Sequence, residues 1–102
     1  YKRQLQTFYD ISSKASGQNW SMTSYCPVPG VGPMTPADNA YQGGFATALM
    51  LKDLKLAMEA AVSVHADVPM GERAAELYAQ FDEAGNGALD FSAIIQTLKH
   101  PA

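Results

Sequence analysis

A lysine and an aspartate, Lys52 and Asp53, stand side by side in the apolar stretch GGFATALMLKDLKLAMEAA at residues 43–61. At about 100° per residue around a helix, Lys52 falls within roughly 20° of Phe45, so its ammonium group is placed on an apolar stripe. Burying an ammonium group without a partner is costly. Lys52 therefore calls for an anion, a polar cofactor atom or a structural partner.

Two structural alternatives remain for these charges. Lys52 can extend its aliphatic stem along the helix to solvent, or it can pair with Glu59 or Asp53. Asp53 falls at the edge of the stripe, where it serves either as a solvated rim residue or as a hydrogen-bond acceptor. Spacing alone leaves the binding and structural roles open.

The element that carries this pair is predicted to be a long helix over residues 45–64, because the stretch lacks Gly and Pro and is rich in Ala, Leu and Met. Few polar positions remain on any of its faces. A helix of this kind is usually central in its domain. We therefore expect protein or ligand around it, not water.

Helical spacing of apolar residues and Gly or Pro stop signals predict the other elements. The expected helices cover residues 2–15, 70–84 and 91–99, with a short helical turn within 16–25. Asp90 is the expected cap of the last helix. The Pro- and Gly-rich residues 26–44 are expected to form an irregular loop. Because no segment alternates like a strand, the sequence predicts an all-α fold.

Composition limits the class of protein. The 102 residues are 47% hydrophobic and 17% charged, which is typical of one globular domain, residues 1–102. A net charge of -3 with scattered basic residues argues against a nucleic-acid partner. Charges interrupt the longest apolar stretch, and no signal-peptide pattern is present, so no membrane span is expected. The single Cys26 favours a buried apolar role and a reducing, cytoplasmic setting.

The segment FDEAGNGALDFSA, residues 81–93, has the outline of a calcium loop that starts at Asp82. Two ligand positions fail, because Ala84 offers no oxygen and Ala93 replaces the closing Glu. We expect a Gly-rich turn there and no metal. His65 and His100 are isolated, and no Ser, Cys or Thr lies in a nucleophile motif, so we name no catalytic residue.

Four segments together resemble the C-terminal domain of the 3-hydroxyisobutyrate dehydrogenases, in the beta-hydroxyacid dehydrogenase family. They are FYDISSKASGQNWSM, YCPVPG, YQGGFATALMLKDLKLAMEAA and LDFSAII, and the match runs from about Leu5 to Leu98. The resemblance implies a helical C-terminal domain of the 6-phosphogluconate dehydrogenase-like type. It also implies a partner Rossmann domain that binds NAD. Two copies are expected to form a homodimer. This chain has neither the glycine fingerprint of that domain nor the family's catalytic lysine motif.

The resemblance further implies NAD-dependent oxidation of the small 3-hydroxy acid 3-hydroxyisobutyrate to methylmalonate semialdehyde, a step of valine catabolism. An L-serine dehydrogenase or a tartronate semialdehyde reductase is the alternative within the family. A helical dimerisation module or a degenerate calcium-binding module is the alternative outside enzymes. The choice between NAD and NADP stays open, because the ribose-reading residues lie in the other domain. The 102 residues alone are expected to be inactive.

Five positions match residues that bind ligands in this family. Lys52 matches the lysine that reaches the nicotinamide cofactor, and Phe45 matches the aromatic residue beside substrate and nicotinamide. Trp20 and Tyr25 match aromatic positions that line the substrate pocket, and Asp53 matches the acid at the cleft. Aromatic walls with a few polar groups give the dry, oriented site that hydride transfer needs.

Overall fold

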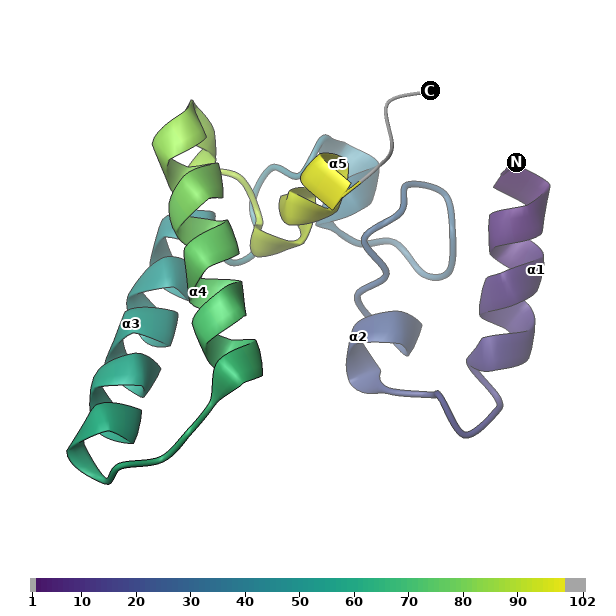
Figure 1. Cartoon of the computed structure of the whole chain (residues 1–102). Coiled ribbons are helices and arrows are strands. Elements are labelled where there is room, and N and C mark those ends of the chain that lie inside the picture. Colours follow the sequence, from purple (N-terminus) through teal and green to yellow (C-terminus); the bar gives the residue numbers. More distant parts are fainter. Residues whose placement is uncertain (1, 99–102) are drawn as a thin grey trace.

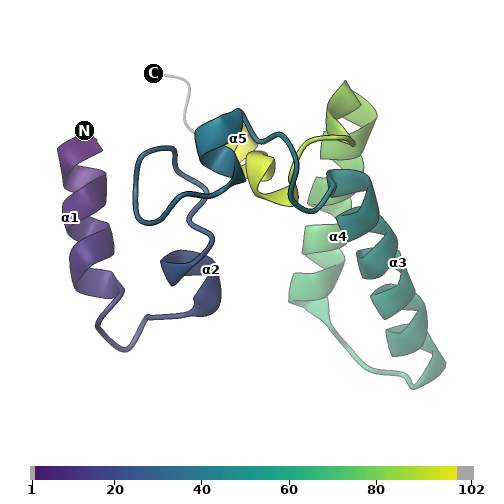
Figure 2. The ribbon, with the colours of Figure 1, turned by 180° about the vertical axis from the view of Figure 1, so that it is seen from behind.

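The computed structural model describes residues 2–98. Its elements are α1 (Lys2–Ser12), α2 (Trp20–Thr23), the 3-10 helix η1 (Pro36–Asn39), α3 (Thr47–Ser63), α4 (Pro69–Phe81), the π-helical turn η2 (Asp82–Asn86), the 3-10 helix η3 (Phe91–Ile94) and α5 (Ile95–Leu98). Within these residues one isolated bridge, Ala46 to Asp90, is the sole β-type pairing. The predicted all-α fold is confirmed, and α3 and α4 form an antiparallel hairpin set apart from α1 and α2 (Figures 1 and 2).

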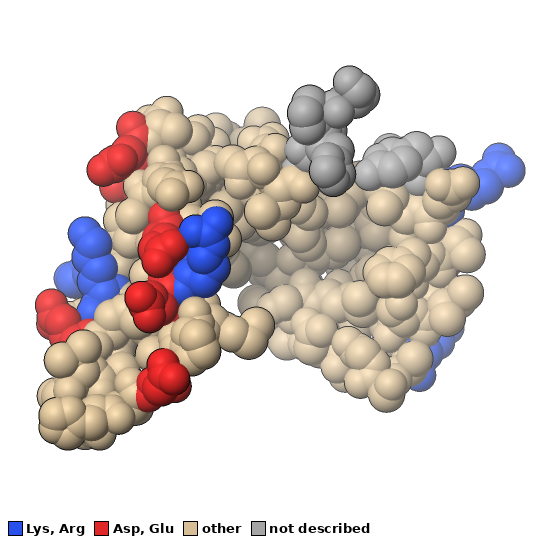
Figure 3. Space-filling view, viewed as in Figure 1, with Lys and Arg blue, Asp and Glu red and all other residues tan. Residues whose placement is uncertain are grey.

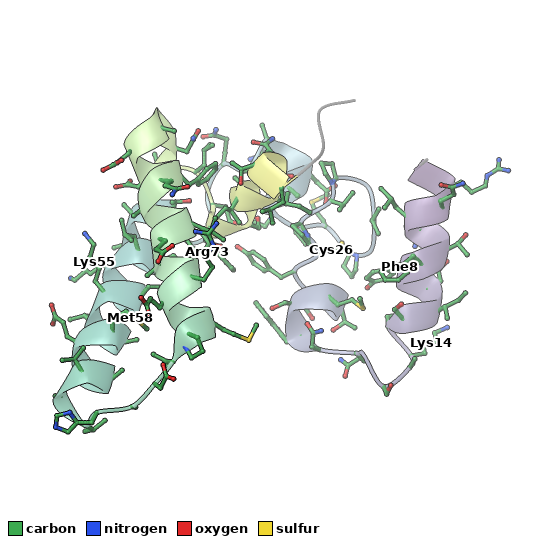
Figure 4. The ribbon with its side chains drawn as sticks, in the orientation of Figure 1. Phe8, Lys14, Cys26, Lys55, Met58 and Arg73 are labelled. Atoms are coloured by element: carbon green, nitrogen blue, oxygen red, sulfur yellow. The ribbon has the colours of Figure 1, made fainter. Side chains whose placement is uncertain are left out.

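Helix α3 packs against α4 along one of its faces. Thr47 and Leu51 are buried in α3, and Leu54 and Met58 continue the same face at helical spacing, half-buried. Met58 lies between the two helices (Figure 4), and a β-carbon at Gly71 of α4 would lie 3.0 Å from its terminal methyl group. A larger residue at this position would require the flexible end of the Met58 side chain to shift by a few tenths of an ångström.

The predicted central position of the helix over residues 45–64 is wrong for the part of the chain that the structure describes. Leu49 is 50% exposed, Leu56 is 53% exposed and Val62 is 74% exposed. The reason is that α3 contacts α4 along one face and residues 87–91 at its first turn, whereas its opposite face stays open. The composition of residues 45–64 predicted a helix, but it did not predict which parts of the chain would cover that helix.

The N-terminal part joins the rest through side-chain contacts of α1 and α2. The Tyr9 hydroxyl group of α1 donates to the Thr23 carbonyl oxygen at the end of α2 over 3.0 Å. A β-carbon at Gly32 would lie 2.8 Å from the Tyr9 ring, and Gly32 has a φ of +71°, so glycine is required there. The predicted first helix is confirmed, although it ends at Ser12.

The expected irregular loop over residues 26–44 is held by hydrogen bonds and contains one regular element, the 3-10 helix η1. Thr35 donates its hydroxyl group to the Cys26 carbonyl oxygen, and the Tyr41 hydroxyl group donates to Pro27 over 2.7 Å. Cys26 is buried, as expected for a small apolar side chain. A compact core lies where the loop meets the end of the chain; it consists of Ala37, Tyr41, Phe81 and Ala93.

The last helices differ in detail from the prediction. Helix α4 ends at Phe81 and continues as the π-helical turn η2, in which Gly85 has a φ of +96°. Asp90 caps the next element by accepting from the Ser92 amide over 3.1 Å, as predicted, but that element is a 3-10 turn followed by one α-helical turn. Lys99 and His100, at or beyond its predicted end, lie outside the described residues.

Two properties of residues 2–98 bear on function. No three His, Cys, Asp or Glu side chains gather there in a group that could hold a metal ion. None of the helices found there has the length and apolar character needed to cross a membrane.

Candidate functional site

Four aromatic rings from separate segments form a continuous surface, which we call the aromatic wall: Trp20, Tyr25, Phe91 and Phe45. The Tyr25 ring stacks on Trp20 and on Phe91, with ring centroids 5.3 Å apart in both pairs. Phe45 meets Phe91 edge to face at 6.0 Å. The structure thus brings together three of the predicted site residues.

Phe91 is the member of the wall that the sequence analysis missed. It stands at the start of the helix expected over residues 91–99, and its ring connects Tyr25 to Phe45. No local spacing reveals this role, because the rings come from positions far apart in the chain. The segment LDFSAII, which carries part of the family resemblance, was the available signal.

Asp90 lies at the centre of this wall and is fully buried. Its Oδ1 atom accepts hydrogen bonds from the Tyr25 hydroxyl group at 2.6 Å and from the Phe45 amide at 2.8 Å. Its Oδ2 atom accepts from the amide and the hydroxyl group of Ser92. One carboxylate therefore joins three segments, which is a typical way to satisfy a buried charge.

The Asp90 carboxylate also changes the acidity of nearby tyrosines. Burial, followed by the hydrogen bond and charge of Asp90, raises the pKa of Tyr25 from 10.0 to about 12. Burial and then the charge of Asp90 raise the pKa of Tyr78. Because a neutral phenol has one proton to donate, the Tyr25 hydroxyl group is committed to Asp90 at neutral pH.

The second glycine of the GGF element, Gly44, has no room for a side chain. A β-carbon at Gly44 would lie 2.2 Å from Asp90 Oδ1 and 2.7 Å from the Tyr25 hydroxyl oxygen, and Gly44 has a φ of +70°. Gly43 also has a positive φ, +76°, but a β-carbon there would meet nothing within 4 Å. Gly44 is therefore needed for space as well as for conformation.

The first turn of α3 is fixed by backbone carbonyl groups from the far end of the chain. The Thr47 amide donates to Leu89 over 2.8 Å, and the Ala48 amide donates to Gly87 over 3.0 Å. These groups would otherwise be free at a helix N-terminus, where phosphates often bind. Any anion near α3 must therefore use side chains, since these backbone donors are occupied.

Lys52 lies on the open face of α3 and is exposed, so the apolar stripe that carries it has no cover among the described residues. It borders a hollow of about 390 Å³ together with Lys55, Leu56, Glu59 and Asp82. Charged side chains gather over this hairpin in Figure 3, and Lys55 points away from α4 in Figure 4.

Neither structural pairing considered for Lys52 is formed. Among residues 2–98, the side chains of Lys52 and Asp53 make no ion pair or hydrogen bond, and the salt bridge found there joins Arg73 to Glu76. Of the structural alternatives, extension into solvent is the one realised. Asp53 is exposed as well.

Four of the five predicted site residues thus fall into two groups, whereas Asp53 lines neither of them. Trp20, Tyr25 and Phe45 belong to the aromatic wall, whereas Lys52 borders the separate hollow on α3. The rise of an α-helix places Lys52 about 7.5 Å beyond Thr47, the first residue of α3. The described residues therefore present these site residues on two surfaces, the aromatic wall and the hollow on α3.

Comparison with known proteins gives the relationship of the chain. Residues 3–98 match the model of the family described as NAD-binding of NADP-dependent 3-hydroxyisobutyrate dehydrogenase. A probable 3-hydroxyisobutyrate dehydrogenase of Mycobacterium tuberculosis is 47% identical over 94 residues, 92% of this chain and 32% of the relative. The mitochondrial 3-hydroxyisobutyrate dehydrogenase of Bos taurus is 42% identical over 89 residues, 87% of this chain and 26% of the relative.

A solved structure supports the same family relationship. The structure described as Mycobacterium tuberculosis 3-hydroxyisobutyrate dehydrogenase with L-serine superposes with a TM-score of 0.86 and 46% identity. The match covers 93% of this chain and 32% of that one, so the chain spans about a third of the length of such relatives. Through the match over residues 3–98, the chain belongs to the NAD-binding family of NADP-dependent 3-hydroxyisobutyrate dehydrogenase.

Proposed function

We propose that this chain is the helical C-terminal part of an NAD(P)-dependent dehydrogenase that oxidises 3-hydroxyisobutyrate to methylmalonate semialdehyde in valine catabolism. The observation that carries the proposal is the open face of α3. There Lys52 stands between Leu49 and Leu56, both about half exposed, and has no ionic partner in the described residues. An apolar stripe with one unpaired ammonium group suits a ligand with a flat apolar ring and polar or anionic groups.

Each predicted residue receives a role in binding. Lys52 and Phe45 would hold the nicotinamide end of the cofactor, while Trp20, Tyr25 and Asp53 would border the substrate. The cofactor, when bound, supplies the acceptor for the hydride of the substrate carbinol. The side chains of this chain orient the two molecules and exclude water from the aromatic wall. No residue of this chain is proposed as the catalytic base.

The rest of the enzyme is part of the same proposal. A Rossmann domain would bind most of the cofactor and complete the cleft, and two copies would form a homodimer. The open face of α3 supports this arrangement, because exposed apolar stripes often mark contact surfaces. The single cysteine supports a reducing compartment such as the cytoplasm.

The test is a Lys52→Ala substitution in the complete enzyme. Titration with NADH and NADPH, followed by fluorescence, should show a dissociation constant raised on the order of tenfold, as expected for loss of one charged contact. Lys14→Ala is the matched control, because Lys14 is an exposed lysine beyond the end of α1. Unchanged affinity and unchanged kcat/KM in Lys52→Ala would return Lys52 to a structural role.

A second substrate has one observation in its favour, since the solved relative is described with L-serine. L-serine carries an ammonium group where 3-hydroxyisobutyrate carries a methyl group, and tartronate semialdehyde, which the enzyme would reduce, carries a hydroxyl group there, so the residues around this one group would decide between the three compounds. Kinetics with all three compounds on the complete enzyme would rank them. If none is turned over, a helical dimerisation module becomes the better proposal. Calorimetry with calcium tests the degenerate calcium-binding alternative, and we expect no heat, because no group of acidic side chains among residues 2–98 could hold the ion.

A further inference from the structure

The two oxygens of the Asp90 carboxylate have different partners. Oδ1 binds the Tyr25 hydroxyl group and the Phe45 amide, so it faces the residues assigned to substrate and cofactor. Oδ2 binds Ser92, two positions along the same turn, and thereby anchors the carboxylate to its own backbone. The Asp90 amide adds a further anchor by donating to Tyr41 over 2.8 Å. Asp90 is thus a fixed point from which the wall is oriented.

The Tyr25 ring has little freedom next to this fixed point. Its hydroxyl group is 2.6 Å from Asp90 Oδ1, and its two faces lie against Trp20 and Phe91. The hydroxyl proton points to the buried carboxylate, so it is not available to a substrate oxygen. What Tyr25 can offer to a ligand is the edge and the remaining exposed part of its ring.

We propose that Asp90 is a positioning residue that holds Tyr25 and the backbone at Phe45, so that the Tyr25 ring and not its hydroxyl proton serves the hydroxy acid. The proposal rests on the proposed function, because it takes the aromatic wall as the substrate surface. Asp90 has no exposed surface and acts only through these neighbours. A purely structural Asp90 would stabilise the same fold without affecting substrate binding.

The experiment compares Tyr25→Phe, Asp90→Asn and the double variant in the complete enzyme. Tyr25→Phe keeps the ring and removes its hydrogen bond to Asp90. We expect KM for the hydroxy acid to rise on the order of tenfold, with kcat and the cofactor KM nearly unchanged. The pH profile of kcat/KM should stay the same, because the hydroxyl group transfers no proton. The effect of the double variant should be smaller than the sum of the two single changes, since both act on the hydrogen bond between Tyr25 and residue 90, which Asp90→Asn weakens and Tyr25→Phe removes.

Tyr41→Phe is the matched control, because Tyr41 also donates its hydroxyl group, to Pro27 over 2.7 Å, but lies outside the wall. It should lower the melting temperature and leave KM unchanged. If Tyr25→Phe behaves in the same way, Asp90 is structural and the proposal fails. A shifted pH profile in Tyr25→Phe would also overturn it.

Two further outcomes are decided by the same set of variants. If Asp90→Asn does not fold, the contrast between Tyr25→Phe and Tyr41→Phe still decides, because neither change removes a ring. If the unmodified enzyme does not oxidise any of the hydroxy acids, the proposed function fails instead, and this result is distinct from an active enzyme whose KM ignores Tyr25.

Discussion

The molecule holds charge in two contrasting ways. At Asp90, one carboxylate is fully buried and both of its oxygens are engaged by other parts of the fold. On α3, Lys52 and Asp53 are exposed and make no ion pair or hydrogen bond through their side chains within residues 2–98. The difference indicates that the first charge organises the chain, whereas the other two are available to something outside it.

The strongest test of this contrast is Asp90→Ala. Loss of the carboxylate leaves the Tyr25 hydroxyl group, the Phe45 amide and the Ser92 amide without their acceptor. Unsatisfied partners of a buried charge should lower the free energy of unfolding by about 4 kcal/mol. Urea unfolding measures this loss, and a change below about 1 kcal/mol would contradict the central place given to Asp90.

A second test compares the adjacent glycines. Gly44→Ala should destabilise the chain by about 3 kcal/mol, because its β-carbon would collide with Asp90 Oδ1 in a left-handed conformation. Gly43→Ala has the same conformational problem but open space, so about 1 kcal/mol is expected. The difference between the two unfolding energies isolates the contact with Asp90. Equal losses would show that backbone conformation alone matters.

A third test uses alkaline pH. The pKa of Tyr25 is raised from 10.0 to about 12 in the folded chain. Between these values the unfolded chain loses the phenol proton while the folded chain keeps it, so stability should fall as pH rises through this window. Below pH 10 the contribution is fully present. Melting temperatures from pH 9 to 12 should fall less steeply in Tyr25→Phe, and identical slopes would argue against both the burial of the Tyr25 hydroxyl group and its contact with Asp90, which together raise this pKa.

The smallest effect belongs to the exposed pair. Lys52→Ala and Asp53→Ala should each change the free energy of unfolding by less than about 0.5 kcal/mol, because neither side chain has an internal partner. Thermal and urea unfolding of the chain without ligand provide the measurement. A loss above about 1 kcal/mol for either variant would remove the contrast with Asp90.

Local composition was sufficient for much of the fold. Helix formers between Gly and Pro signals predicted α1, α3 and α4, and the position of Asp90 predicted its contact with the Ser92 amide. Burial of α3 was not predictable in the same way. A helix with apolar residues on every side does not show which side finds a neighbour, and α4 covers only one.

The candidate site was predictable to a lesser extent. The resemblance brought forward Trp20, Tyr25 and Phe45, which the structure places in one wall, but the link that orients them is a carboxylate 65 residues after Tyr25. Spacing along the chain does not reveal a contact between residues so far apart, so the sequence predicts only the capping role of Asp90. The full arrangement follows only from tertiary structure.

The carbonyl groups that hold the first turn of α3 have a mechanical consequence. Backbone hydrogen bonds to residues 87 and 89 fix the first two residues of α3, Thr47 and Ala48, whereas its last residue, Ser63, lies farthest from these bonds. At 1.5 Å per residue, Lys52 lies about 7.5 Å along the helix from Thr47, and Ser63 lies about 24 Å from Thr47. A small pivoting of the hairpin would therefore displace Lys52 about one third as far as Ser63. The Lys52 side chain is therefore accessible to a ligand, and its backbone would move less than the end of the hairpin.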